Sequence, residues 1–184
     1  AEAIGAACDA LRAAAAGAAL GTRDFRTTAL AAIAIGNVMA TVQVGDGAIV
    51  TIARDGRTTR LGSADSGSYS GEVVAFVPEV DLAAIESRVV TTTLDDVEGV
   101  LVLTDGIEDP FYPVERRGTD IARQLYHGVT TPADGFRAQA VHGPIVGAAN
   151  ALDLLEQWIA FERRGENDDR TLAGAFRRPG TIDR

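Results

Sequence analysis

The spacing of apolar residues predicts a helix at the start of the chain, followed by a long series of short strands. Residues 2–20 are rich in alanine, the residue with the highest helix propensity. After residue 25, runs of apolar and β-branched residues alternate with turns that contain glycine, a pattern typical of antiparallel strands. The runs that predict strands are 26–37, 38–44, 48–54, 73–78, 87–94 and 99–104.

The glycine-containing turns predict how these strands are connected. Gly36-Asn37 indicates a turn between the first two strands, and the sequence "GDG" (45–47) predicts that 38–44 and 48–54 form an antiparallel hairpin. Asp55-Gly56 is the strongest short hairpin signal in the chain and leads into "RTTRLG". The Gly- and Ser-rich stretch 62–72 indicates a surface loop. The first half is therefore predicted to be a β-meander.

The second half combines a buried strand with helices. Residues 99–104 are apolar on both faces, which predicts a central strand, and 119–128 predicts a short helix. Residues 150–165 form an amphipathic pattern, and 170–176 predicts a last strand. The apolar side of the amphipathic helix, with Trp158 as a core residue, consists of Leu154, Leu155, Trp158, Ile159 and Phe161. This order predicts sheet layers covered by helices, and without repeats or linkers it favours one domain over 1–184.

Composition and charge narrow the classes of function. The net charge of −9 and the pI of about 4.7 disfavour binding to nucleic acid or to anionic lipid. No apolar run is long enough to span a membrane and no signal peptide opens the chain. A single cysteine, Cys8, excludes an internal disulfide framework and fits a reducing cytosol, so a cytoplasmic protein is expected, and its small apolar neighbours predict a buried, inert thiol. His127 and His142 are far apart, which argues against a histidine-based zinc site.

Three short acidic motifs lie next to predicted strands: "VGDG" (44–47), "TDGIED" (104–109) and "NDDRT" (167–171). Any one of them is ordinary turn chemistry, and a solvated turn is the alternative interpretation. Together they suggest more, because neighbouring carboxylates repel one another unless a cation lies between them. Mg²⁺ and Mn²⁺ prefer such oxygen ligands, whereas the spacing of an EF-hand calcium loop is missing.

In order and spacing these motifs resemble the metal-dependent phosphatases of the protein phosphatase 2C family. That family has Gly-Asp-Ser-Arg in a hairpin, Ser/Thr-Asp-Gly-x-x-Asp after a central strand, and Asp-Asn-x-Thr before the final strand. This chain has Gly-Asp-Gly-Ala at 45–48, Thr-Asp-Gly-Ile-Glu-Asp at 104–109 and Asp-Asp-Arg-Thr at 168–171. "SYSGEVVAFVP" also resembles, in a degraded form, a Gly-Glu-Tyr-x-Asn-Glu segment of a bacterial branch. The resemblance covers roughly residues 26–176.

The resemblance implies a fold and a metal site. The fold would be α+β, a four-layer α-β-β-α sandwich of antiparallel sheets. Asp105 and Asp168 match the ligands of the metal nearest the reacting phosphate. Asp46 and Asp109 match acids that, with Asp105, hold an additional and weaker metal. The ions would be Mn²⁺ or Mg²⁺, two or three of them in a complete domain. Asp169 stands where the family usually has Asn.

The start of the chain departs from the family pattern. The family's Asp-Gly-x-Gly turn, whose Asp bridges two catalytic metals, does not precede the first helix, and its phosphate-binding Arg has no counterpart. Arg170 is near the acids, but solvent exposure or an acidic partner is expected for it. Residues 1–20 resemble the second of two family helices, so the chain is either a fragment or a degenerate member. A start on "AEAIG" without Met favours a fragment.

The function implied is hydrolysis of phosphoserine or phosphothreonine in proteins by a metal-activated water. The partners would be a phosphoprotein substrate and, as a further candidate, a cognate Ser/Thr kinase in a signalling role. This chain alone is expected to be inactive or nearly so, because the bridging Asp is missing. The alternative is a pseudophosphatase, a module that keeps the fold and binds a phosphoprotein or kinase without turnover.

Overall fold

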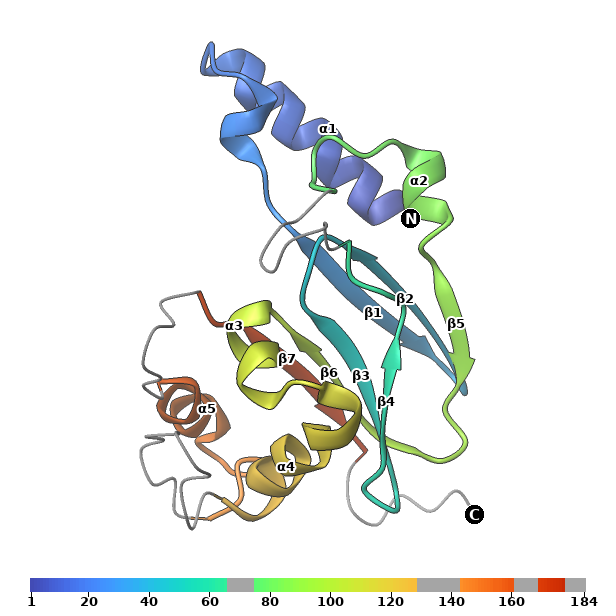
Figure 1. Cartoon of the computed structure of the whole chain (residues 1–184), viewed down its shortest axis with the longest axis vertical. Helices are drawn as coiled ribbons and strands as arrows, with labels where there is room; N and C mark the ends of the chain where they lie inside the picture. The colour runs from blue at the N-terminus through green and yellow to red at the C-terminus, as the bar shows by residue number, and fades with distance from the viewer. Residues whose placement is uncertain (66–74, 129–142, 161–168, 178–184) are drawn as a thin grey trace. The chain divides into compact units, whose positions relative to one another are not determined.

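The computed structural model describes residues 1–65, 75–128, 143–160 and 169–177 (Figure 1). These residues belong to two compact units. The first consists of Ala1–Ile49 and Arg60–Asp95, and the second of Val50–Thr59 and Asp96–Arg184. One antiparallel sheet lies mainly in each unit, together with helices. This confirms the predicted α+β class, and two sheets with helices are the components of the expected sandwich. The assignment of 1–184 to one domain stays a prediction.

The first unit contains a three-stranded sheet in the order β1-β2-β5. Its first two strands form the hairpin predicted around Gly36, with Ile35 opposite Val38 and Ala29 opposite Val44. Gly36 has a φ of 58°, which glycine adopts at little cost in a tight turn. The elements of this unit are α1 (Glu2–Gly17), η1 (Thr22–Phe25), β1 (Ala29–Ile35), β2 (Val38–Val44), α2 (Leu82–Glu86) and β5 (Val90–Thr93).

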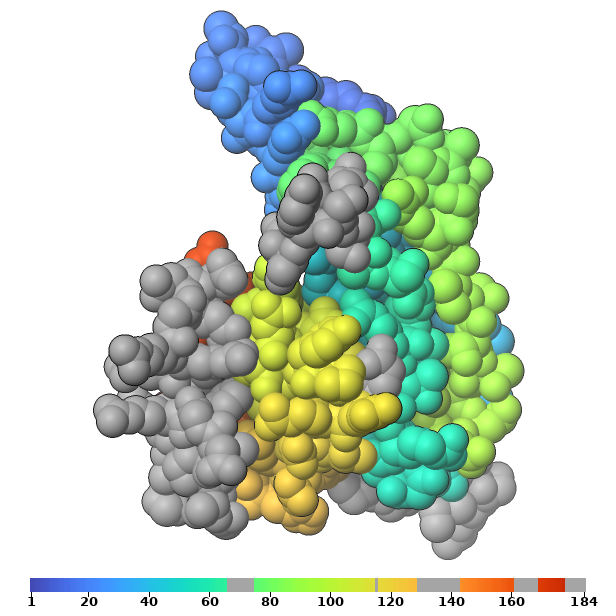
Figure 2. Space-filling model, in the orientation of Figure 1, coloured from blue at the N-terminus to red at the C-terminus, as the bar shows by residue number. Residues whose placement is uncertain are grey.

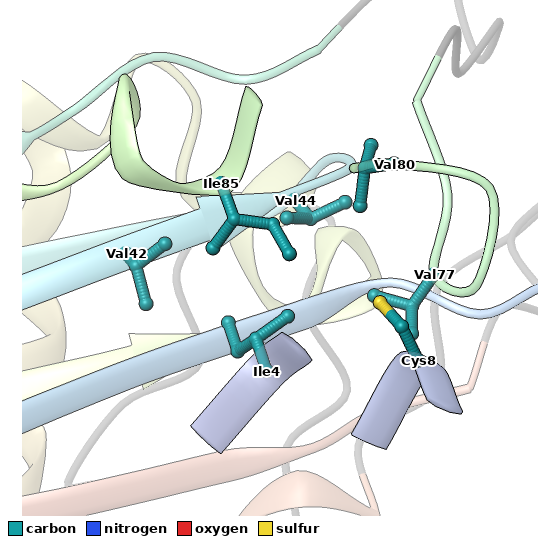
Figure 3. Packing of buried hydrophobic residues seen from close by; sticks show 7 residues of the cluster. All are labelled: Ile4, Cys8, Val42, Val44, Val77, Val80 and Ile85. Carbon is teal, nitrogen blue, oxygen red and sulfur yellow. The ribbon is translucent and has the colours of Figure 1, made fainter. Parts of the chain in front are cut away.

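One side of α1 supplies part of the core of this unit. Figure 3 shows Ile4 and Cys8 of α1 in a cluster with side chains of β2, α2 and the segment before α2. Cys8 is 1% exposed, and burial raises the pKa of its thiol, so the predicted buried state is confirmed. Most other side chains of α1 are exposed, and its atoms form part of the blue surface in Figure 2. The cluster consists of Ile4, Cys8, Val42, Val44, Val77, Val80 and Ile85.

The second sheet has the order β4-β3-β6-β7, so the strand predicted to be central, β6, is indeed an inner strand. The predicted Asp55-Gly56 hairpin joins β3 to β4, and the N–H of Ala53 donates to the carbonyl of Arg57 at 2.8 Å. β6 and β7 are antiparallel, with Leu103 opposite Leu172. The strands are β3 (Ala48–Ala53), β4 (Thr58–Leu61), β6 (Val97–Leu103) and β7 (Leu172–Phe176).

Two longer helices belong to the second unit, α4 (Val114–His127) and α5 (Ala151–Ile159). Trp158 is 1% exposed, stacks on Phe111 at 6.0 Å between ring centroids, and donates from its indole N–H to Gln124 at 3.0 Å, which confirms its predicted core role. α4 begins five residues before the predicted start at 119. Its Gly118 weakens the helical pattern but packs against Thr58, where a Cβ would be crowded.

The predicted hairpin between 38–44 and 48–54 is wrong. β2 pairs with β1 and β5, whereas β3 pairs with β4 and β6, so the "GDG" turn joins strands of different sheets. Gly45 and Gly47 have φ values of 95° and 91°, which redirect the chain between the two strands. A hairpin was predicted because a glycine turn between apolar runs is also the local signal for one.

Two segments before β5 also differ from prediction. Of the predicted strand 73–78, residues 73 and 74 lie outside the described part, and Val77 forms only an isolated bridge with Thr27. Asp81 starts the unpredicted helix α2, since its carboxylate accepts the Ala84 N–H at 2.7 Å. Within the described ranges, none of the helices combines the length and the apolar character that crossing a membrane requires.

Candidate metal centre

The first acidic motif is a turn in the first unit, immediately after β2. Gly45 and Gly47 are buried and both have positive φ, whereas Asp46 between them is half-buried. A Cβ added at Gly45 would overlap the side chain of Thr28, so only glycine fits there. The turn therefore presents Asp46 from a backbone that is closely packed on both sides.

Polar side chains hold this turn through its carbonyl oxygens. Gln43, 3% exposed, donates from Nε2 to the carbonyls of Gly45 at 3.2 Å and Gly47 at 2.9 Å. Arg60 donates from its guanidinium to the Gly47 carbonyl at 2.6 Å. Gln43 thus binds both glycines that flank Asp46, and Arg60 binds the second of them. Neither residue is among the predicted site residues, although a glutamine in an otherwise apolar strand is a visible signal.

Asp65 holds the same turn from another direction. Its carboxylate accepts the N–H of Gly45, and its own N–H donates to the Gly45 carbonyl, each at 3.0 Å. Arg88 binds the Asp65 carboxylate at 2.8 Å and donates to the carbonyl of Ala84 in α2 at 2.7 Å. The hydrogen bond with Asp65 raises the pKa of Arg88. A half-buried ion pair therefore links α2 to the turn.

The second motif begins where β6 ends, in the second unit. Asp105 opens the one-turn helix α3 (Asp105–Glu108), and its carboxylate accepts the N–H of Gly106 at 2.9 Å. Asp109 follows one helical turn later, at the start of η2 (Asp109–Phe111), and its N–H donates to the Asp105 carbonyl. Asp105 is half-buried and Asp109 exposed. Between them, Glu108 is only 6% exposed, a buried acid that the sequence did not suggest.

Thr104 ties this motif to the third one. Its hydroxyl donates to the carbonyl of Asp169 at 3.1 Å and accepts the N–H of Thr171 at 2.9 Å. Its own N–H donates to the Thr171 carbonyl at 3.1 Å. The residues that precede β7 therefore lie beside the residue that precedes Asp105.

The third motif is described only from Asp169 onward, and Asp168 lies outside the described residues. Asp169, which replaces the family's Asn, is exposed. Arg170, for which the sequence predicts solvent exposure or an acidic partner, is half-buried and donates to the Ile159 carbonyl at 3.2 Å.

That Asp46, Asp105, Asp109 and Asp168 together bind metal stays a prediction. Asp46 belongs to the first unit and Asp105 and Asp109 to the second. In the part of the chain that the structure describes, no group of three or more His, Cys, Asp or Glu side chains is arranged to hold a metal ion. The chemistry of the acids fits a hard cation, because all donors are carboxylate oxygens and Asp105 uses one of its several acceptor sites for Gly106.

Solved structures with some similarity are crystal structures of a bacterial serine phosphatase. The unsubstituted protein is 18% identical with a TM-score of 0.38, and two variants with one arginine replaced are each 17% identical with TM-scores of 0.37 and 0.38. Each match covers 50% of this chain, and the chain covers only 37% to 44% of those proteins. Among curated proteins, no significant match is found.

A family model shows the relationship at the level of sequence. The model described as Protein phosphatase 2C matches residues 1–139, more than half of the chain. The matched part includes α1, the turn with Asp46, and the motif with Asp105 and Asp109. Together with the α+β fold, this match assigns the chain to the protein phosphatase 2C family.

Proposed function

We propose that the protein hydrolyses phosphoserine and phosphothreonine in proteins, with Mn²⁺ or Mg²⁺ as cofactor. Membership of the protein phosphatase 2C family supports this general activity. The observation that carries the proposal is the network around Thr104, which holds residues 169–171 against the segment that contains Asp105. Asp168 itself lies outside the described residues, and its part in the proposal rests on the family resemblance.

In this proposal Asp105 and Asp168 hold the ion nearest the substrate phosphate, and Asp46 and Asp109 contribute to a weaker position. When bound, the ions supply a water of lowered pKa and neutralise the phosphoryl oxygens. The chain itself fixes the ligands. Thr104 anchors the junction between β6 and α3, and the Gly106 N–H restrains one oxygen of Asp105.

The substrate and its setting belong to the same proposal. A phosphoprotein is repelled by a chain with a net charge of −9, so the local cations would have to offset that repulsion at the site. A cognate Ser/Thr kinase is the natural source of such a substrate, and the cytoplasm is the proposed location.

The test is turnover of a phosphothreonine peptide by the full-length protein with and without Mn²⁺. We expect Mn²⁺-dependent release of phosphate, loss of turnover to background for Asp105→Asn, and a smaller loss for Asp109→Asn. Asp96→Asn is the matched control. It changes an exposed acid directly before the first residue of β6, at the opposite end of the strand from Asp105, and should keep full activity.

Turnover that persists without divalent cations would contradict the mechanism. Tight binding of the phosphopeptide without any turnover would instead favour the pseudophosphatase. Binding should be measured by calorimetry on the same samples, so that the two outcomes are separated.

A further inference from the structure

We propose that Gln43, assisted by Arg60, is a positioning residue that fixes the Asp46 turn for metal binding. This inference rests on the proposed function, in which Asp46 contributes to the weaker metal position. Gln43 does not reach the metal in this scheme. It acts through the backbone on either side of Asp46.

The geometry of Gln43 matches this role. One amide nitrogen donates both to the carbonyl before Asp46 and to the carbonyl after it, at 3.2 Å to Gly45 and 2.9 Å to Gly47. A single side chain thereby fixes the separation between the two flanking glycines. Arg60 adds a second donor to Gly47 at 2.6 Å.

The turn needs such a restraint because glycine loses more conformational freedom on ordering than any other residue. Asp46 lies between two glycines, so the backbone on either side of it contributes little to holding the carboxylate in place. A turn ordered before the ion arrives avoids that entropic cost at binding. Groups that hold a metal ligand in place typically change metal affinity by about 10- to 100-fold when they are removed.

The burial of Gln43 supports a role beyond packing. Residues 41–44 of β2 are all buried, and an apolar side chain would suit position 43. Instead, the side chain is 3% exposed and its Oε1 has no hydrogen-bond partner in the described part of the chain. Leaving a buried acceptor unpaired is unfavourable, so the two donor contacts to the turn are the feature that justifies an amide here.

The test is calorimetric titration of Mn²⁺ alone into the full-length protein and its variants. Gln43→Met keeps the length of the side chain but removes the donors. We expect about a tenfold or larger loss of affinity at the Asp46-dependent site. In turnover assays the Mn²⁺ concentration for half-maximal activity should rise equally, with kcat at saturating Mn²⁺ unchanged.

Thr41→Val is the matched control. Thr41 is also buried in β2, at 3% exposure, and its hydroxyl donates to the Val90 carbonyl at 3.4 Å, away from the turn. Thr41→Val should leave Mn²⁺ affinity within about twofold, well below the effect of removing a group that holds a metal ligand in place. If Gln43→Met fails to fold, Arg60→Met replaces it, and Arg60→Lys should restore affinity because lysine can donate to the Gly47 carbonyl.

Asp46→Asn tests the proposed metal ligand separately from the proposed positioning role of Gln43. If it weakens Mn²⁺ binding while Gln43→Met and Arg60→Met do not, the positioning role is overturned and the proposed ligand stands. If Asp46→Asn leaves Mn²⁺ binding unchanged, Asp46 is not a ligand and the positioning role is overturned with it. Equal losses for Gln43→Met and Thr41→Val would show a purely structural effect and would also overturn the inference.

Discussion

The turn with Asp46 and the junction with Asp105 are held in different ways. Gly45 and Gly47 are fixed by three side chains of the first unit: Gln43 from the adjoining strand, and Arg60 and Asp65 from further along the chain. The Asp105 junction combines local helix geometry with the hydroxyl of Thr104, which binds the segment that contains Asp169 and Thr171.

This difference shows how two acidic motifs that both contain Asp-Gly can differ in how strongly their conformation depends on tertiary contacts. A glycine turn has little intrinsic preference for one conformation and depends on tertiary contacts. A residue before a helix already has a preferred geometry, so one hydroxyl is enough to attach the junction to its neighbour. Substitutions near the Asp46 turn should therefore cost more stability than those near Asp105.

The largest expected effect is at Gly45. Gly45→Ala adds a Cβ at a φ of 95° that overlaps Thr28, so strain and overpacking should together lower the free energy of unfolding by about 3 kcal/mol. Gly56→Ala, at a φ of 82° with open space around it, carries only the backbone cost of about 1 kcal/mol. Urea denaturation measures both, and equal losses would refute the close packing of the turn.

The second effect concerns the ion pair behind the turn. Arg88→Met leaves the carboxylate of Asp65, whose side chain is 16% exposed, without its guanidinium, and should cost about 2 kcal/mol. In the second unit the Arg57–Asp55 pair has side chains that are 74% and 60% exposed, so Arg57→Met should cost much less, because solvent screens the pair. Chemical denaturation of both variants tests this ranking, which fails if Arg57→Met costs as much.

At the Asp105 junction we expect a smaller loss. Thr104→Val removes the hydroxyl that contacts Asp169 and Thr171, which should cost about 1 kcal/mol. The Thr171 amide, which donates to that hydroxyl at 2.9 Å, should exchange with deuterium faster. Thr104→Ser keeps the hydroxyl and should preserve the protection. Unchanged exchange in Thr104→Val would mean that another group holds the segment.

The smallest effect is a pH-dependent one at the edge of the first unit. The hydrogen bond from Arg26 lowers the pKa of Glu79 below its usual 4.5, so this pair stabilises the fold above that pH. The contribution is lost as the pH falls through the lowered value. The melting temperature of Glu79→Gln should therefore be slightly lower than that of the unsubstituted protein at pH 7, and the two should converge in acid. A gap that persists at low pH would exclude the ion pair as its cause.

Much of the local structure was predictable from the sequence. The alanine-rich run predicted α1, and Gly36-Asn37 and Asp55-Gly56 predicted two hairpins that the structure confirms. The apolar run of β6 predicted an inner strand, and the amphipathic pattern around Trp158 predicted the burial of that side chain. These features depend on residues close together in the chain, so composition and period suffice to identify them.

Only the tertiary structure decided which strands pair and what surrounds the acids. The "GDG" turn has the local appearance of a hairpin, but its two strands belong to different sheets, because β2 is paired on both edges by β1 and β5. Arg60 and Asp65 contact the turn through bonds that no local pattern encodes. The sequence by itself determined the acidic motifs, their order and the family. Arg60 and Asp65 at the first motif, and residues 169–171 at the second, are distant in the chain from the acids, and only folding brings them there.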